Sequence, residues 1–141
     1  MLRLVLDTAV VTSAFRSRHG ASNLLLQAVA RRRAVAVVTT ALFLEYEDVL
    51  GRAEQRAATG LDEAATRHAL AALAAVLEPV EVHFRWRPQL RDPADELVLE
   101  AAINGGAEVI VTFNLRDFVG RVERFGVTAL PPAAALARLR T

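Results

Sequence analysis

Short runs of mainly apolar residues constrain the fold of this chain more than any other feature. The clearest lie at residues 4–6, 35–39 and 107–112. They are apolar at successive rather than alternate positions, which is typical of strands buried on both faces of a sheet. Amphipathic segments separate the runs. Repeated strand–helix units with short connections predict a mainly parallel sheet covered by helices on both faces, a three-layer α/β/α sandwich.

The other expected elements follow from periodicity and from residues that end helices. Helices are predicted over residues 21–33, 41–51, 62–78, 95–104 and 131–140. Val80, Val82 and Phe84 alternate with polar residues, which predicts a half-exposed strand, and a further short strand is expected over residues 127–130. The sequence shows no linker, repeat or low-complexity segment, so residues 1–141 are expected to form a single domain.

The composition excludes several classes of site. The chain has no cysteine, which removes disulfides, thiol nucleophiles and thiolate zinc sites, so any metal would bind oxygen or imidazole. The three histidines show no ligand spacing and are left out of the predicted site. The first residues lack the features of a signal peptide, and no segment approaches the roughly 20 apolar residues of a membrane span. We therefore expect a cytoplasmic protein with no membrane association.

The charge of the chain is nearly balanced, with a formal net charge of +1, so it argues neither for nor against a nucleic-acid partner. All 17 cationic residues are arginines, whose fork of donors suits phosphate. Two clusters stand out, Arg31 to Arg33 and the set Arg85, Arg87 and Arg91. The first is expected to be a solvated helix end. Either cluster could also serve as a phosphate track.

Acidic, amide and hydroxyl side chains gather where the predicted strands end. In a parallel sheet the functional crevice lies beyond the carboxyl ends of the strands. Four separate parts of the chain bring oxygen-bearing side chains to that edge: Asp7 with Thr8, Thr39 with Glu45 in the next helix, Asp92 with Asp95, and the octet VTFNLRDF with Thr112, Asn114 and Asp117. Their convergence predicts a site that binds a cation or catalyses a reaction.

Each of these residues also has a purely structural interpretation. Asp92, followed by Pro93 and Asp95, has the pattern of a helix N-cap, in which Asp95 could complete the cap. Thr112, Asn114 and Asp117 could serve a turn. Glu45 lies beside the apolar face of its helix and is expected to be partly buried. Asp7 is the hardest to explain structurally, because a carboxylate that ends a buried strand needs compensation.

Taken together, the motifs resemble those of PIN domains. The resemblance rests on Asp7-Thr8, on Thr39 followed by residues 44–50, on residues 92–95 leading to Ala101-Ala102, and on the octet at residues 111–118. Residues 13–17 and 20–22 further resemble a PIN subgroup of toxins from toxin–antitoxin systems, related to the VapC type. The resemblance covers nearly the whole chain and keeps the order and spacing of the motifs.

The resemblance implies an endoribonuclease that depends on Mg²⁺ or Mn²⁺. Carried over residue by residue, it assigns Asp7, Glu45 and Asp95 as catalytic metal ligands. Asn114 takes the place of a fourth acid and Asp117 lies close enough to contribute, whereas Ala9 replaces a common asparagine. Residues expected to bind substrate or orient ligands are Thr8, Ser13, Arg16, Thr112 and Arg116. The implied partners are RNA, a small antitoxin and a second copy of the chain.

Other functions stay open at this point. An RNA-processing or repair nuclease would use the same residues. A catalytically weak module that binds RNA or a protein would have kept the fold without the full acid set. Whether Asn114 and Asp117 serve as metal ligands distinguishes this module from an active nuclease. A response-regulator receiver also places acids at strand ends, but it requires a late lysine, and this chain has none. The apolar residues Leu24 to Leu26 support the expected homodimer.

Overall fold

A five-stranded parallel sheet forms the centre of the computed structural model, which describes residues 1–85 and 89–139. The strands lie in the order β3-β2-β1-β4-β5, and all pairings are parallel. Their bounds are β1 (Arg3–Leu6), β2 (Val35–Val38), β3 (Glu78–Pro79), β4 (Val109–Val111) and β5 (Thr128–Leu130). The predicted parallel sheet is therefore confirmed.

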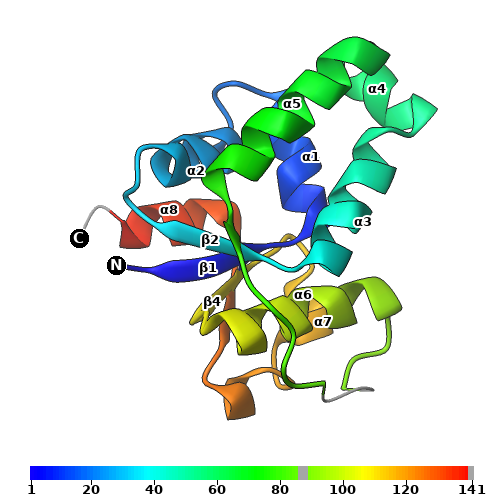
Figure 1. The fold of residues 1–141 in the computed structure, drawn as a ribbon. Coiled ribbons are helices and arrows are strands. Elements are labelled where there is room, and N and C mark those ends of the chain that lie inside the picture. The colour runs from blue at the N-terminus through cyan, green and yellow to red at the C-terminus, as the bar shows by residue number, and fades with distance from the viewer. Residues whose placement is uncertain (86–88, 140–141) are drawn as a thin grey trace.

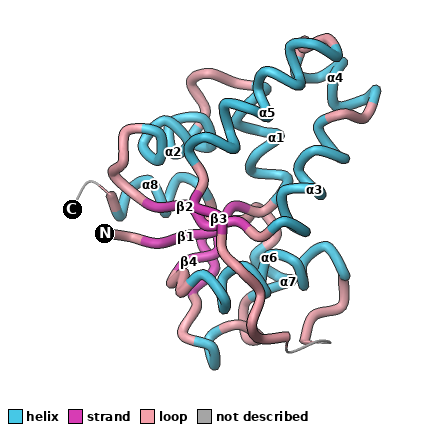
Figure 2. Tube along the Cα trace, viewed as in Figure 1, coloured by secondary structure: helices cyan, strands magenta, loops and turns pink. Residues whose placement is uncertain are grey.

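Helices cover both faces of this sheet (Figure 1). Helices α1, α2, α3 and α5 lie on one side, and α6 and α7 lie on the other (Figure 2). Their bounds are α1 (Thr8–Arg16), α2 (Ala21–Ala30), α3 (Thr40–Leu50), α4 (Ala53–Thr59), α5 (Glu63–Val76), α6 (Pro93–Gly105), α7 (Leu115–Phe118) and α8 (Pro132–Arg138), with a short 3₁₀ helix at Glu123–Phe125. The arrangement is the expected three-layer α/β/α sandwich.

The central strand β1 explains why the site can form at one edge. Leu4 pairs with Ala36 of β2 and Leu6 pairs with Val111 of β4, so the carboxyl ends of β1 and β4 meet. The side chains of β1 after Arg3 are buried, as successive apolar residues predict. No helix among the described residues is long and apolar enough to cross a membrane.

The helices α1, α4 and the short α7 were not predicted from the sequence, and α2 ends earlier than predicted. Helix α1 follows β1 directly, because the Asp7 carboxylate caps its first turn. Helix α4 has no buried residue, so its sequence shows no apolar stripe from which a helix could be predicted. Helix α2 ends at Ala30 rather than Arg33, and Arg32 takes a positive φ of 62° in the turn that follows. Arg31 to Arg33 are exposed after this helix end, as expected.

The strand predicted over residues 80–84 was wrong. The fifth strand in the sheet is instead β3, a two-residue edge strand containing Pro79, where a missing N–H is tolerated. Beyond Val80, the backbone N–H groups of His83 and Phe84 donate to Oδ1 of Asn104 on α6, at 2.7 and 2.8 Å. These two backbone N–H groups are bonded to a side chain rather than to a neighbouring strand. The alternating residues 80–84 therefore form no strand.

The observed ends of several helices differ only slightly from the predicted ones. The last helix ends at Arg138, and Arg140 of the prediction lies outside the described residues, as does Arg87 of the second arginine cluster. Arg85 and Arg91 of that cluster are exposed. Helix α6 stops where predicted, with Gly106 in the left-handed conformation at φ 63°.

Gly105 marks a close approach between α6 and β2 and provides a test of the packing. A Cβ at this position would lie 2.7 Å from Cγ2 of Val37. We expect Gly105→Ala to lower the free energy of unfolding by about 2 kcal/mol in urea denaturation, although alanine favours helix more than glycine does. Combined with Val37→Ala, the loss should be smaller than the sum of the two single losses. Strict additivity would contradict the proposed clash.

Candidate active site

Asp7 stands at the junction of β1, β4 and α1. Its backbone N–H donates to the Val111 carbonyl at 2.9 Å. Its Oδ1 accepts the Thr8 backbone N–H at 2.8 Å and its Oδ2 accepts the Thr112 hydroxyl at 2.7 Å. The side chain is only 8% exposed. Both carboxylate oxygens are thus held in place by groups from two different segments.

Thr112 joins this carboxylate to the turn that leaves β4. Its buried hydroxyl donates to Asp7 and accepts the backbone N–H of Asn114 at 2.9 Å. Its own N–H donates to the carbonyl of Leu130 on β5 at 2.9 Å. One threonine therefore satisfies the backbone where the strand ends and fixes the acid on the neighbouring strand. This combination explains a polar residue at a fully buried position.

The start of α6 supplies a second buried acid. Asp92 is the N-cap, and its carboxylate accepts the Ala94 N–H at 2.9 Å with Pro93 in the first turn, so the predicted cap is confirmed. Asp95 lies in the same first turn and is 7% exposed. Within the described part of the chain, the Asp95 side chain forms no recorded hydrogen bond to that cap. The prediction that it completes the cap is therefore not supported.

Burial and the charges of neighbouring acids raise the pKa of both Asp7 and Asp95. The pKa of Asp95 rises to about 7, first through burial and then through the charges of Asp7, Asp92, Asp117 and Glu96. Burial raises the pKa of Asp7 too, against the hydrogen bonds from Thr112 and Thr8, and the charges of Asp92 and Asp117 raise it further. Among the described groups that shift these two pKa values, none is cationic. Neither acid forms an ion pair with an arginine among the described residues.

Glu45, the remaining predicted acid, lies on α3 and is half-buried, as expected. After the hydrogen bond and charge of Asp48, its charge also raises the pKa of Arg52. The next residue, Tyr46, is buried and donates its hydroxyl to the Leu6 carbonyl at 2.5 Å. This bond fixes α3 against the end of β1, one residue before Asp7. The burial of Tyr46 could have been predicted from its place on the apolar face of its helix.

The octet contributes exposed groups rather than a tight ligand set. Asn114 begins α7, but its side chain makes no capping hydrogen bond, and Asp117 is exposed on the same short helix. The turn interpretation therefore applies to Thr112 and not to the Asn114 side chain. Within residues 1–85 and 89–139, no group of three or more acids or histidines is arranged to hold a metal ion. Asp117 acts on Asp7 and Asp95 through its charge.

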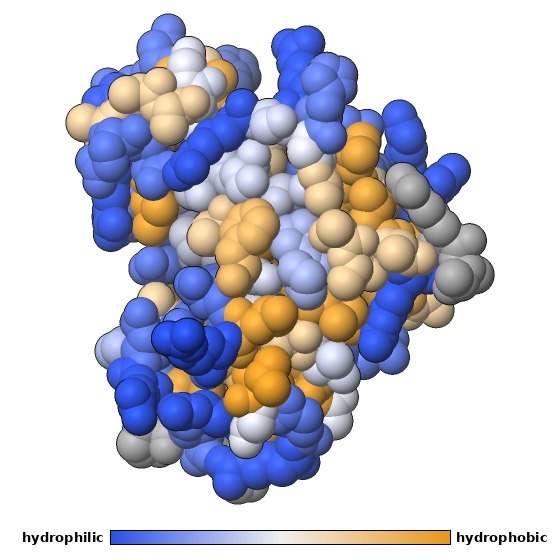
Figure 3. All heavy atoms as spheres, turned by 180° about the vertical axis from the view of Figure 1, so that it is seen from behind, coloured by the Kyte–Doolittle hydropathy of each residue, from blue (hydrophilic) through white to orange (hydrophobic). Residues whose placement is uncertain are grey.

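The predicted substrate-binding residues differ in their burial and contacts. Thr8 is buried and its N–H holds Asp7, whereas Ser13 is half-buried on α1. Arg16 is exposed at the end of α1 and donates to Oε1 of Gln55 on α4 at 2.8 Å. Arg116 is exposed on α7. In Figure 3 the surface is indented between the lobe with α3 and α4 and the lobe with α6 and α7.

Comparison with known families agrees with this geometry. A sequence model described as PIN domain matches residues 3–116. The chain belongs to the PIN-domain family. No curated protein matches it. PIN domains are generally nucleases and typically use divalent metal ions, so the chain is a PIN-domain protein of a nuclease family.

The donors present at the strand ends fit a hard divalent cation. Asp7 and Asp95 offer buried carboxylate oxygens, and burial with the charges of neighbouring acids raises the pKa of both. Magnesium prefers oxygen ligands and is usually held by one or two carboxylates, with water and substrate phosphate completing its shell. Two central acids with Asp117 nearby match that requirement without a preformed cage.

The raised pKa of Asp95 makes a prediction for stability without metal. Between pH 4 and 7 the folded protein keeps a proton that the unfolded chain has lost, so stability should fall as pH rises through this window and level off above it. We expect Asp95→Asn to raise the free energy of unfolding in EDTA at pH 8 on the order of 2 kcal/mol and to flatten the fall.

Asp62→Asn provides the matched control, because Asp62 caps α5 through the Ala65 N–H at 2.7 Å and is exposed. This variant should keep the pH dependence of the wild-type protein. Urea denaturation at several pH values measures both effects. An Asp95→Asn protein no more stable than wild type at pH 8 would show that the buried carboxylate carries no electrostatic cost.

Proposed function

We propose that this PIN-domain protein is an Mg²⁺- or Mn²⁺-dependent endoribonuclease and the toxin of a toxin–antitoxin pair. The observation that carries the nuclease proposal is the pair formed by Asp7 and Asp95, two buried acids from different elements with raised pKa values and no cationic partner among the described groups that shift them. Such a pair is costly in the free protein and becomes favourable when a cation neutralises it. Capping α1 accounts structurally for Asp7, but no hydrogen bond in the described part of the chain accounts for the buried Asp95 side chain.

Each residue of the crevice has a distinct proposed role. Asp7 and Asp95 hold the ion, and Thr8 and Thr112 orient the Asp7 oxygens through hydrogen bonds of 2.8 and 2.7 Å. A bound divalent ion lowers the pKa of an attacking water and stabilises charge on the leaving oxygen. Asn114 and Asp117, both exposed on α7, can add an amide and a carboxylate oxygen where substrate enters.

Glu45 stays in the proposed catalytic set for a positional reason. The bond from Tyr46 to the Leu6 carbonyl fixes α3 beside the end of β1, so Glu45 lies on an element anchored next to Asp7. Arg16 and Arg116 are exposed at the ends of α1 and α7 and are proposed to contact phosphates of single-stranded RNA. Guanidinium groups at this rim would offset the repulsion between RNA phosphates and the acids.

A catalytically weak binding module is the second candidate. The observation in its favour is that no group of three acids or histidines in the described part of the chain is arranged to hold a metal. The position of a fourth acid holds Asn114, an uncharged ligand. This module would bind RNA or a partner through the same crevice but would hydrolyse little or nothing.

The partner proposals rest on apolar surface that the single chain does not bury. Leu25 and Val29 of α2 are buried within the chain, whereas Leu24 is exposed and Leu26 is half-buried. A hollow of about 200 Å³ lies between α2 and α5 and is lined by apolar side chains that include Leu26 and Val76. We propose that a second copy of the chain uses this surface and that an antitoxin covers the crevice.

Metal-dependent cleavage is the direct test of the enzyme proposal. The purified protein should cleave a labelled single-stranded RNA with Mn²⁺ or Mg²⁺ and should lose that activity in EDTA. Asp7→Asn should reduce the rate at least 100-fold, because a neutral amide replaces the buried carboxylate that holds the ion. Gel analysis of the products measures the rate. The control Asp62→Asn removes an exposed carboxylate at the start of α5 and should cleave like wild type.

Cleavage that continues in EDTA would contradict the metal proposal. Absence of cleavage with every divalent ion, accompanied by RNA binding, would favour the weak binding module. A short neighbouring reading frame for a DNA-binding protein that copurifies with this chain would support the toxin assignment, and an isolated gene would count against it.

Asn114 decides between these two functions, because it replaces the expected fourth acid. Asn114→Asp should tighten Mn²⁺ binding several-fold, since a charged oxygen strengthens a hard-cation site. Asn114→Ala should weaken it while the free energy of unfolding changes by less than about 1 kcal/mol, because the side chain makes no capping hydrogen bond. Titration calorimetry and urea denaturation measure the two quantities. Unchanged Mn²⁺ affinity in both variants would remove Asn114 from the site and leave Asp117 as the better candidate.

A further inference from the structure

The two phenylalanines of the octet have opposite environments. Phe118 is 0% exposed and anchors α7 in the core, whereas Phe113 is 51% exposed. A phenylalanine left half in water forfeits much of the burial energy that a core position would provide. The exposure of Phe113 directly after Thr112, whose hydroxyl holds Asp7, calls for another explanation.

The backbone on both sides of Phe113 is held by hydrogen bonds. Before it, the N–H of Thr112 donates to the Leu130 carbonyl at 2.9 Å. After it, the N–H of Asn114 donates to the Thr112 hydroxyl at 2.9 Å, and the same hydroxyl donates to the Asp7 carboxylate at 2.7 Å. The exposed ring is thus carried by a fixed segment directly connected to the central acid, rather than by a loose loop.

The charge of the crevice limits how RNA can be held there. Asp7, Asp95 and Asp117 are acidic, and ionised carboxylates repel phosphates. A neutral aromatic face has no such repulsion and stacks on any unpaired base. Arg116, exposed three residues after Phe113, can contact a neighbouring phosphate. An aromatic ring beside an arginine is the combination that binds single-stranded nucleic acid.

We propose that Phe113 is a stacking platform for one unpaired nucleobase next to the phosphate that is cleaved. The inference rests on the proposed ribonuclease function and defines its substrate class further. A base within a duplex is already stacked on its neighbours and cannot lie on the ring. Phe113 therefore selects single-stranded RNA at the acidic crevice without reading its sequence.

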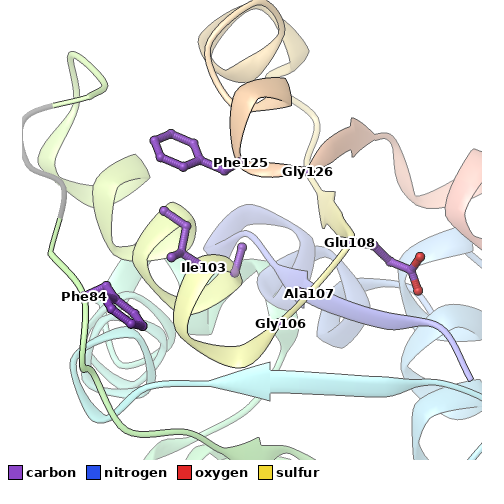
Figure 4. A pocket seen from close by; sticks show the side chains of 8 residues that line it. Phe84, Ile103, Gly106, Ala107, Glu108, Phe125 and Gly126 are labelled. Carbon is purple, nitrogen blue, oxygen red and sulfur yellow. The ribbon is translucent and has the colours of Figure 1, made fainter.

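The matched control is Phe84, which is 57% exposed at the other end of the strands. It lines a hollow of about 450 Å³ with Ile103, Ala107 and Phe125, as Figure 4 shows. Ala107 and Gly106 of this hollow precede β4, whereas Asp7 follows β1 and Asp117 follows β4. Phe84→Leu and Phe113→Leu therefore make the same change, at similar exposure, at opposite ends of the strands.

Steady-state cleavage of a single-stranded RNA with Mn²⁺ is the first measurement. Phe113→Leu should raise KM about 10-fold with kcat changed less than about twofold, because the lost stacking acts on binding rather than on chemistry. Phe113→Tyr, which keeps an aromatic face, should stay within about twofold of wild type. Phe84→Leu should match wild type. Equal KM values for Phe113→Leu and wild type would overturn the proposal, including the case in which the ring contacts a protein partner instead.

An abasic RNA separates stacking from any general effect of the substitution. Binding is measured by fluorescence anisotropy with Ca²⁺ replacing Mn²⁺, using an intact oligonucleotide and a set in which one base at a time is removed. One abasic position should weaken binding to wild type about 10-fold and should have less than about a twofold effect on Phe113→Leu. Independent, additive losses would overturn the proposal.

The two proposals fail in different ways. If wild type cleaves RNA but Phe113→Leu cleaves and binds it equally well, the stacking proposal fails and the nuclease proposal stands. If wild type binds intact RNA with the predicted dependence on Phe113 but never cleaves it, the nuclease proposal fails and the stacking site stands. A protein that binds no RNA under these conditions overturns both.

Discussion

The hydrogen bonds to the Asp7 carboxylate are the interaction on which the rest of the site depends. The Thr112 hydroxyl reaches Oδ2 from the end of β4, and the Thr8 N–H reaches Oδ1 from the start of α1. One carboxylate thus caps a helix and joins two neighbouring strands. Because Tyr46 bonds to the carbonyl of the preceding residue, α3 is fixed to the same point. The fold positions several elements around a single acid.

That acid is held at an energetic cost that the hydrogen bonds from Thr112 and Thr8 offset only in part. Burial and the neighbouring carboxylates raise the pKa of Asp7 and of Asp95, and no arginine is among the described groups that shift these values. Buried charges are normally paired or bind a metal. Functional sites commonly keep such unfavourable groups, because the binding of a ligand relieves them. The proposed metal site, the proposed RNA binding and the proposed role of Phe113 all start from this cost of keeping buried acids close together.

The sequence predicts the fold where local pattern and tertiary environment agree. The segments that form β1, β2 and β4 are apolar at successive positions because both faces of the sheet are covered. Asp92 followed by Pro93 indicates the start of α6. The prediction failed where a distant side chain decided the outcome. Residues 80–84 alternate like a strand, but Asn104 takes their backbone donors. The site shows the same division, because spacing brings acids to one edge but cannot reveal that Thr112, rather than Asn114, completes the turn.

The position of a bound ion tests the central claim most directly. Crystals soaked in Mn²⁺ should show an anomalous scattering peak at the Asp7 and Asp95 carboxylates, because a hard divalent cation prefers oxygen ligands. The peak should disappear in Asp7→Asn crystals treated identically. A peak bound elsewhere, or no peak at these two carboxylates in millimolar Mn²⁺, would contradict the account of Asp7 as the centre of a metal site.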